Sequence, residues 1–206
     1  MFYGILDPAR SALLPALAAF KDRFYLAGGT GLALWLGHRR SIDFDFFTAE
    51  PFDADTLNAE LAGIFAGREY TVTGLEARTL HAIAGGVRLS FLGYRYPLLE
   101  PLTQEPRLSI ASVTDIGCMK LSAVVSRATM KDFVDVYEIL KHQSLADLVA
   151  AAARKLPELD RLLVLKSLNY FDDIADEHLD WMPGREVPFS HVKESITEEI
   201  RKIALH

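Results

Sequence analysis

Residues 24–48 read as a strand, a helix and a second strand, and this unit constrains the fold more than any other segment. A short apolar run ends in Gly28-Gly29, and the residues that follow, 30–36, have the composition of a helix. Residues 41–48 then alternate apolar and polar side chains, as a strand with one buried face does. We therefore expect a sheet that contains both strands.

Two aspartates, Asp43 and Asp45, share one face of the second strand, because successive side chains of a strand point to opposite faces. Their backbone positions are roughly 6.5–7 Å apart, so both carboxylates can converge on one hard cation. Aspartate is depleted in strands and like charges on one face repel, so the pair needs water or a cation to offset it. Two interpretations stay open: a metal-binding pair, or a solvated edge strand whose charges prevent aggregation.

The glycine turn favours phosphate. A strand that ends in Gly28-Gly29-Thr30 and opens straight into a helix offers unencumbered backbone N–H groups and the positive end of a helix dipole. A Gly-Gly turn alone can equally serve only to allow positive φ. The order of turn, helix and acidic strand is more specific, because it brings Asp43 and Asp45 to the same end of the sheet as the turn. This layout predicts a site for a nucleoside triphosphate with Mg²⁺.

A cationic segment, His38-Arg39-Arg40-Ser41, lies between the turn and the acids. Arg40 and Ser41 directly precede the acidic strand, so either can reach a triphosphate, and the planar donor fork of arginine suits phosphate oxygens. The alternative is a basic helix end that complements the helix dipole. We favour this alternative for His38, because no second histidine stands at ligand spacing, and leave both open for Arg40 and Ser41.

Strand patterns end at about residue 93 and helical patterns follow. Gly85-Gly86 predicts a hairpin turn. The strands expected after residue 48 are 70–75, 78–83 and 87–92, and a connection is expected over 96–106. Outside residues 24–48, the expected helices are 10–20, one from Asp53, 112–126, 131–142, one from Ser144, 159–173 and one after Ser190. The sequence thus predicts an α+β fold, with an α/β core over residues 1–108 and a helical region over residues 109–206.

A second chemically informative stretch lies in the helical region. Lys120 stands four residues from apolar positions on either side, so its stem lies along an apolar stripe and its ammonium needs an anionic partner, either a phosphate or an acid. One interpretation is that Lys120 and Asp132 close on a nucleotide. The other is that the charges of this stretch form helix-end and i,i+4 ion pairs such as Lys131–Asp135, worth a few tenths of a kcal/mol.

Composition excludes several classes of protein. The 28 acidic and 22 basic side chains give a formal net charge of −6, which argues against an indiscriminate polyanion binder. The single cysteine, Cys118, allows no intramolecular disulfide and no thiolate zinc cage. No apolar run reaches the roughly 20 residues of a membrane span, and the first ten residues lack the pattern of a secretory signal. We expect a cytoplasmic protein that does not act at a membrane.

The two stretches together resemble the nucleotidyltransferase-like toxins of the AbiEii/AbiGii type, which are related to the MNT and MenT families of the polymerase-β-like nucleotidyltransferase superfamily. The resemblance covers roughly residues 20–142. The residues that carry it are Gly28-Gly29-Thr30-Gly31-Leu32-Ala33-Leu34, Gly37-His38-Arg39-Arg40-Ser41-Ile42-Asp43-Phe44-Asp45-Phe46-Phe47, Asp115-Ile116-Gly117-Cys118-Met119-Lys120, Arg127 and Lys131-Asp132-Phe133-Val134-Asp135.

The resemblance implies a mixed sheet flanked by helices, a helical C-terminal region that completes the active site, and transfer of a nucleoside monophosphate from ATP, GTP or CTP with Mg²⁺ or Mn²⁺. The residues that it assigns to phosphate and nucleotide are Gly28, Gly29, Thr30, Arg40, Ser41 and Lys120. It assigns Asp43 and Asp45 to the metal, and Asp43, Asp45, Lys120 and Asp132 to catalysis. It also implies an RNA (tRNA) or protein acceptor and a cognate antitoxin, because members act as toxins of two-gene toxin–antitoxin or phage-abortive systems.

One departure from the pattern bears on catalysis. The wider superfamily often places a third acid on a later strand, where this chain has Ser90, a poor base and a weak Mg²⁺ ligand. Glu76, in a turn-like setting, is a weak substitute. Either another group such as Asp132 deprotonates the acceptor, or the chain is a regulatory module that binds nucleotide without efficient transfer. A helical adaptor that binds no nucleotide is a third hypothesis.

Overall fold

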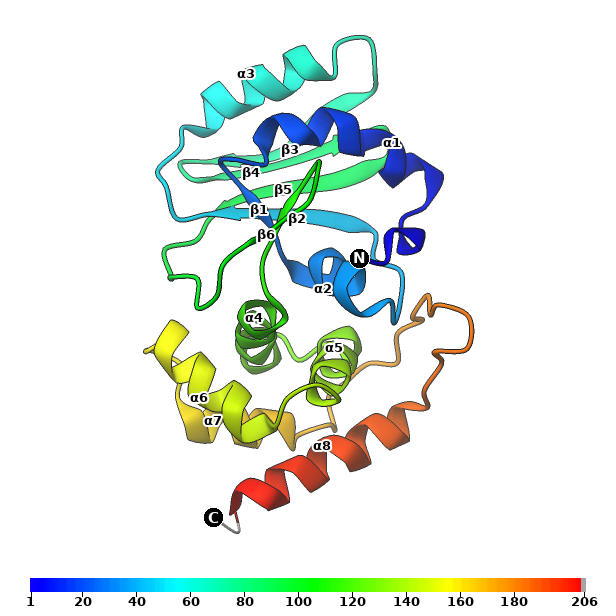
Figure 1. Ribbon diagram of the computed structural model, residues 1–206, viewed down its shortest axis with the longest axis vertical. Coiled ribbons are helices and arrows are strands. Elements are labelled where there is room, and N and C mark those ends of the chain that lie inside the picture. Colours follow the sequence, from blue (N-terminus) through cyan, green and yellow to red (C-terminus); the bar gives the residue numbers. More distant parts are fainter. Residues whose placement is uncertain (205–206) are drawn as a thin grey trace. The chain divides into compact units, whose positions relative to one another are not determined.

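A computed structural model describes residues 1–204, which divide into two compact units. The first unit comprises Met1–Pro97 and Pro101–Ser112, and the second comprises Leu98–Glu100 and the chain from Val113 onward. The strands β1–β7 all belong to the first unit, and the second unit is built from the helices α4–α8 (Figure 1). The predicted α+β fold with a mixed sheet is confirmed.

The first unit follows the predicted order of elements closely. Its elements are the short 3-10 helices η1 (Tyr3–Ile5) and η2 (Ala18–Phe20), the helices α1 (Pro8–Leu17), α2 (Gly28–Leu36) and α3 (Ala54–Ile64), and the strands β1 (Tyr25–Leu26), β2 (Asp43–Thr48), β3 (Tyr70–Glu76), β4 (Thr79–Ala84), β5 (Val87–Gly93), β6 (Thr103–Gln104) and β7 (Ser109–Ile110). Asp53 caps α3 by accepting a hydrogen bond from the Thr56 N–H at 2.8 Å. Gly85 and Gly86 both have positive φ, as the hairpin between β4 and β5 requires.

The seven strands form one mixed sheet in the order β3-β4-β5-β2-β1-β7-β6. β2 is its middle strand, antiparallel to β1 and parallel to β5. The register places Asp43 opposite Arg88 and Asp45 opposite Ser90. The acidic strand therefore lies in the centre of the sheet, not at an edge, so the alternative of a solvated edge strand is wrong.

One face of the sheet is an aromatic core. Phe46 stacks on Phe91 with ring centroids 5.0 Å apart, and Phe20 and Phe24 meet Phe91 edge to face at 5.5 and 5.1 Å. α3 covers the same face, because Tyr70, which shares this face, stacks on Phe65 just after α3 (Figure 1). Each such buried ring contributes roughly 1.5–3 kcal/mol relative to an exposed one, so this face fixes the register of β2.

The opposite face of the same strands is polar and only partly covered. Because β2, β5 and β4 pair in register, the side chains that alternate away from the core share this second face. The polar ones among them are Asp43 and Asp45 on β2, Arg88 and Ser90 on β5, and Thr79 and His81 on β4, all half-buried except the exposed Arg88, and Phe47, Ile83 and Leu92 share the face with them. We call this second face, to which Gly74 and Glu76 of β3 also belong by register, the open face.

The structure differs from the sequence-based expectations in two short strands and in the ends of several elements. The connection expected over 96–106 contains β6, and β7 follows it and pairs in parallel with β1 through Leu26 and Ile110. Strands of two residues are too short to show alternation. β2 begins at Asp43, two residues later than expected, which leaves Ile42 58% exposed. The helix expected over 159–173 is shorter, Arg161–Leu168.

The second unit is arranged around α4. Its helices are α4 (Val113–Ser126), α5 (Met130–Leu140), α6 (Leu145–Lys155), α7 (Arg161–Leu168) and α8 (Phe189–Ala204). α4 packs against α5, α6 and α7, and α8 packs against α5, α6 and α7. Gly117 lets α4 and α6 approach closely, because a Cβ at this position would lie 2.7 Å from the Leu148 Cδ1 atom.

A buried ion pair ties the second unit together. Lys155 at the end of α6 donates to Asp115 on α4 at 2.7 Å, and both side chains are fully buried. Asp115 also accepts hydrogen bonds from the backbone N–H groups of Leu99 at 2.9 Å and Glu100 at 3.2 Å. This pairing explains why residues 98–100 belong to the helical unit, although the strands of the first unit precede and follow them in sequence.

Candidate active site

The N-terminus of α2 presents backbone donors that the helix itself does not use. Ala27 is the N-cap residue, and the first backbone bond of the helix runs from Gly31 N to Ala27 O at 2.9 Å. The N–H groups of Gly28, Gly29 and Thr30 precede that bond, and no side chain caps this helix end within residues 1–204. Free N–H groups at the positive end of a helix dipole bind anions such as phosphate.

Gly28 lies directly against Asp45. Its φ is +61°, and a Cβ at this position would lie 2.6 Å from the Asp45 Oδ2 atom, so the site requires glycine for both conformation and space. The Ala27 N–H donates to the main-chain oxygen of Asp45 at 3.0 Å. The glycine turn and the acidic strand therefore meet, as the order of the sequence elements predicts.

The Thr30 side chain connects α2 to β2. Its side chain is buried and its hydroxyl donates to the main-chain oxygen of Asp43. The hydroxyl therefore fixes the start of α2 on the start of β2. This leaves the backbone N–H of Thr30, not its hydroxyl, for an anion.

Arg39 and Ser41 lie against Gly29. A Cβ on Gly29 would lie 2.8 Å from the Arg39 Nη2 atom and 3.0 Å from the Ser41 Oγ atom. Arg39 is 6% exposed and its Nη1 donates to the main-chain oxygen of Arg40 at 3.1 Å, whereas Arg40 itself is exposed. The sequence predicts that Arg40 and Ser41 bind the triphosphate, and this stays a prediction; Arg39, which was not singled out there, is the cation that lies against Gly29. Arg39 stands two residues before Ser41 in the sequence, and this spacing was the signal that both side chains could lie on the same side of the segment.

Asp43 and Asp45 offer the oxygen ligands that Mg²⁺ prefers. Both are half-buried on the open face, beside the glycine turn. No group of three or more His, Cys, Asp or Glu side chains that could hold a metal occurs in the described part of the chain. Mg²⁺ is commonly held by one or two carboxylates together with substrate phosphates, so this pair fits a metal that arrives with a nucleotide.

Lys120, Asp132 and Asp135 form an ion cluster in the second unit. The Lys120 Nζ atom lies 3.0 Å from Asp132 Oδ1 and 2.5 Å from Asp135 Oδ2, and all three side chains are nearly or fully buried. Arg127 and Thr129 donate to Asp132 Oδ2 at 2.8 and 2.6 Å. Asp135 therefore pairs with Lys120, where the sequence-based alternative suggested Lys131.

The cluster holds Asp132 in its charged form. Burial pushes the pKa of Asp132 upward, but the hydrogen bond from Arg127, the positive charge of Lys120 and the hydrogen bond from Thr129 outweigh burial and lower the pKa to about 2. A carboxylate with so low a pKa binds a proton weakly at neutral pH, so it is poorly matched to general-base catalysis.

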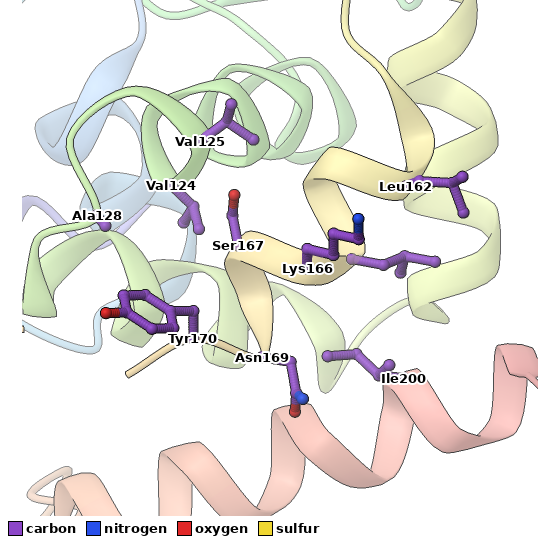
Figure 2. A pocket seen from close by; sticks show the side chains of 10 residues that line it. Val124, Val125, Ala128, Leu162, Lys166, Ser167, Asn169, Tyr170 and Ile200 are labelled. Atoms are coloured by element: carbon purple, nitrogen blue, oxygen red, sulfur yellow. The ribbon is translucent and has the colours of Figure 1, made fainter. Parts of the chain in front are cut away.

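The second unit also contains a pocket of about 700 Å³ between α4, α7 and α8 (Figure 2). Its walls are largely apolar, with Val124, Leu162, Tyr170 and Ile200 among them, and Lys166 is its one charged residue. None of the residues that the sequence singled out for catalysis or nucleotide binding lines this pocket. Its lining offers one cation and few donors, which does not suit a triphosphate.

Comparisons with solved structures define the class of the fold. MenT4, a nucleotidyltransferase toxin from Mycobacterium tuberculosis H37Rv, matches with a TM-score of 0.60 at 17% identity, over 94% of this chain and 82% of that chain. JHP933 from Helicobacter pylori matches with a TM-score of 0.57 at 16% identity, over 94% and 89%. ANT(2")-Ia in complex with adenylyl-2"-tobramycin matches with a TM-score of 0.51 at 15% identity, over 72% and 95%. The fold is that of nucleotidyltransferases.

The family follows from the sequence match. The family model described as "Nucleotidyl transferase AbiEii toxin, Type IV TA system" matches residues 12–186. This chain belongs to the AbiEii toxin family and is a nucleotidyltransferase, as the resemblance predicted. The uncharacterized protein aq_aa25 of Aquifex aeolicus (strain VF5) is 37% identical over 160 residues, 75% of this chain and 76% of that protein. No helix within residues 1–204 is both long and apolar enough to cross a membrane.

Proposed function

We propose that this chain binds a nucleoside triphosphate with Mg²⁺ or Mn²⁺ at the Gly28-Gly29 turn and transfers the nucleoside monophosphate to an RNA, such as tRNA, or to a protein. A cognate antitoxin restrains this activity in the cytoplasm. The observation that carries the proposal is the contact of Gly28 with Asp45, which joins an uncapped helix N-terminus to a pair of carboxylates. Membership of the AbiEii family supports the toxin role.

Each part of the site has a role in this proposal. The N–H groups of Gly28, Gly29 and Thr30 bind phosphate oxygens, and Arg39 and Ser41, which lie against Gly29, add a guanidinium and a hydroxyl. Arg40 is exposed on the adjoining segment and is the alternative cation for the triphosphate. These donors neutralise and orient the phosphates without a large rearrangement, because the fold already holds them together.

Asp43 and Asp45 would hold the metal. Bound there with the nucleotide, Mg²⁺ would neutralise phosphate charge and polarise the α-phosphoryl group. In the transfer, the acceptor oxygen attacks the α-phosphorus, the bond from the α-phosphorus to the bridging oxygen breaks, and pyrophosphate leaves. The proton of the acceptor hydroxyl must go to a base of the protein or to water.

The family resemblance also assigns Lys120 and Asp132 to the site, and this assignment stays a prediction. Asp132 is fully buried and paired with both Lys120 and Arg127. We infer that Asp132 serves as the partner that holds the Lys120 ammonium in place, because its low pKa makes it a weak base.

A transfer assay tests the proposed function. We expect the purified protein, incubated with Mg²⁺, total RNA or lysate and each of the four NTPs in turn, to label an acceptor from α-labelled nucleotide. Label on the γ-phosphate should not be transferred, because it leaves with pyrophosphate. Asp43→Asn should lower the transfer at least about 100-fold, since it removes a charged ligand of the metal that would polarise the α-phosphoryl group.

Asp55→Asn is the matched control, because Asp55 is an exposed acid on α3 and the substitution makes the same chemical change. It should transfer like wild type. Absence of α-label on any acceptor with all four NTPs, from protein that melts cooperatively, would refute the proposed transfer. Full activity of Asp43→Asn would refute the assigned site.

The second candidate function is nucleotide binding without efficient transfer. The observation in its favour is that Ser90, not an acid, stands opposite Asp45 on β5. This candidate predicts that NTP with Mg²⁺ raises the melting temperature while no label reaches an acceptor. The same two measurements therefore separate the candidates.

A further inference from the structure

A histidine stands beside the serine that replaces the third acid. On the open face, Asp45 of β2 is opposite Ser90 of β5, and Ser90 is opposite His81 of β4. The Nδ1 atom of His81 lies 3.2 Å from the Ser90 Oγ atom. With neighbouring strands about 4.8 Å apart, the backbone of Ser90 lies roughly 5 Å from that of Asp45, and that of His81 roughly 10 Å.

The sheet is shaped to accommodate this ring. Gly74 on β3 is the register partner of His81, and a Cβ on Gly74 would lie 3.2 Å from the His81 Cδ2 atom. A register irregularity between Val72 and Gly74 interrupts the strand at this point. The imidazole therefore lies over a position without a side chain, and the Ser90 hydroxyl holds its Nδ1 edge.

The other ring nitrogen, Nε2, has no hydrogen-bond partner among residues 1–204. The charged side chains that share the open face with His81 are Glu76 on β3, Arg88 on β5, and Asp43 and Asp45 on β2. Of the helices of this unit, α3 packs on β3 and β4 and covers the aromatic face, whereas α2 packs on β2 and its Gly28 lies against Asp45 on the open face. The imidazole is thus the side chain of this face whose ring nitrogen has a lone pair that can accept a proton.

We propose that His81, oriented by Ser90, is the general base for the acceptor hydroxyl. This inference rests on the proposed function. If the Nδ1–H donates to Ser90 Oγ, the lone pair of Nε2 is free to accept a proton. As the acceptor oxygen attacks the α-phosphorus, its proton passes to Nε2, pyrophosphate leaves, and the imidazolium then returns the proton to solvent.

The proposed base, His81, lies on β4, next to the strand β5 that carries Ser90 at the position of the usual third acid. The position of the usual third acid holds a short hydroxyl, which cannot act as a base but can fix a histidine. Asp132, the other candidate base, has a pKa of about 2 and four donor atoms around it. His81 needs no rearranged ion cluster to accept a proton, because its Nε2 atom has no hydrogen-bond partner among residues 1–204.

Steady-state transfer rates of His81 variants over a range of pH test the proposal. We expect His81→Gln and His81→Ala to lower kcat at least about 100-fold while binding NTP with Mg²⁺ as wild type does, since a general base contributes about 10²–10⁴-fold to rate. His142→Gln is the matched control, because His142 is exposed in the second unit. Ser90→Ala should lower kcat less, since it loosens the ring but keeps the base.

A rescue variant makes the test specific. Ser90→Asp in the His81→Ala background places a carboxylate opposite Asp45, where the superfamily often has its third acid. We expect it to recover at least about tenfold in rate. The acidic limb of the pH–rate profile should also move to lower pH, because a carboxylate is a weaker base than an imidazole.

The outcomes separate the inference from the proposed function. If wild type transfers nucleotide and His81→Gln stays within twofold of it across the pH range, the inference is wrong and the proposed function stands. If neither wild type nor the Ser90→Asp variants transfer nucleotide, the proposed function fails and the inference fails with it. Should His81→Ala fail to fold, His81→Gln, which keeps an amide donor for Ser90, carries the test.

Discussion

Two adjacent glycines determine the geometry of the site at the scale of single residues. Gly28 needs its positive φ and its missing side chain because Asp45 occupies the space. Gly29 has ordinary helical φ but lies against Arg39 and Ser41, so it is required for space alone. Gly28 therefore leaves space for the Asp45 carboxylate, and Gly29 leaves space for the Arg39 and Ser41 donors.

Substitution of Gly29 by alanine should weaken nucleotide binding without unfolding the protein. The added Cβ would lie 2.8 Å from Arg39 Nη2, and the flexible guanidinium must move away. We expect the affinity for NTP with Mg²⁺, measured by calorimetry, to fall about tenfold, or about 1.4 kcal/mol.

Gly63→Ala in α3 is the control for this prediction, because a Cβ there meets nothing within 4 Å. It should leave binding unchanged and can raise the stability by up to about 1 kcal/mol. Wild-type affinity in Gly29→Ala would contradict the placement of Arg39 at the phosphates.

Pairs of elements are held together by buried charges as well as by apolar contacts. Lys120 on α4 meets Asp132 and Asp135 on α5, and Lys155 on α6 meets Asp115 on α4. Removing one partner of such a pair is costly, because a buried charge is left uncompensated. The charges therefore fix how these helices pair.

Asp132 makes the stability of the second unit dependent on pH. Its folded-state pKa of about 2 lies below the ordinary value of 3.8, so charged Asp132 stabilises the fold above about pH 4. The stabilisation is lost as the pH falls towards 2. Asp132→Asn should lower the free energy of unfolding at pH 7 by about 2 kcal/mol, and the difference from wild type should shrink towards pH 2.

Denaturant unfolding at a series of pH values measures this effect. The exposed control, Asp55→Asn, should change the free energy of unfolding by less than about 0.5 kcal/mol. A difference for Asp132→Asn that stays constant between pH 7 and pH 2 would show that packing, not charge, accounts for it.

The sequence predicted most elements because their signals are local. Alternation identified β2, Asp53 and Ser144 marked the starts of α3 and α6, and Gly85-Gly86 marked a hairpin. β7 was missed because its two residues are recruited by pairing with β1, which is distant in sequence. Likewise, the sequence showed that Lys120 needs an anion, but only the packing of α4 on α5 selects Asp132 and Asp135.

The candidate site shows the same division between local and long-range information. The glycine turn contacts β2 because only a short segment connects them, so the order of the elements in the sequence was enough to predict this contact. The choice of Arg39 over its neighbour depends on which side chain turns inward, and the pairing of His81 with Ser90 depends on strand register. Neither can be read from one segment alone.

At the scale of the whole molecule, the formal net charge of −6 limits how an RNA acceptor can bind. Part of that charge is Asp43 and Asp45, which a bound Mg²⁺ would neutralise. An acidic protein lacks the positive field of a general nucleic-acid binder, so binding would rest on local basic residues and weaken as salt rises. The position of the bound nucleotide and its metal therefore decides how much of this negative charge an RNA acceptor meets.

The most direct test of a nucleotide site at the glycine turn and the paired acids is to measure the melting temperatures of wild type, Asp43→Asn and Asp45→Asn. Each protein is measured with each NTP, with and without Mg²⁺. Ligand at 100 times its dissociation constant stabilises a protein by about 2.7 kcal/mol. We predict that at least one NTP with Mg²⁺ raises the melting temperature of wild type, and that both variants melt cooperatively but lose most of the rise. No rise with any of the four NTPs, or an equal rise in both variants, would contradict a nucleotide site at the glycine turn and the paired acids.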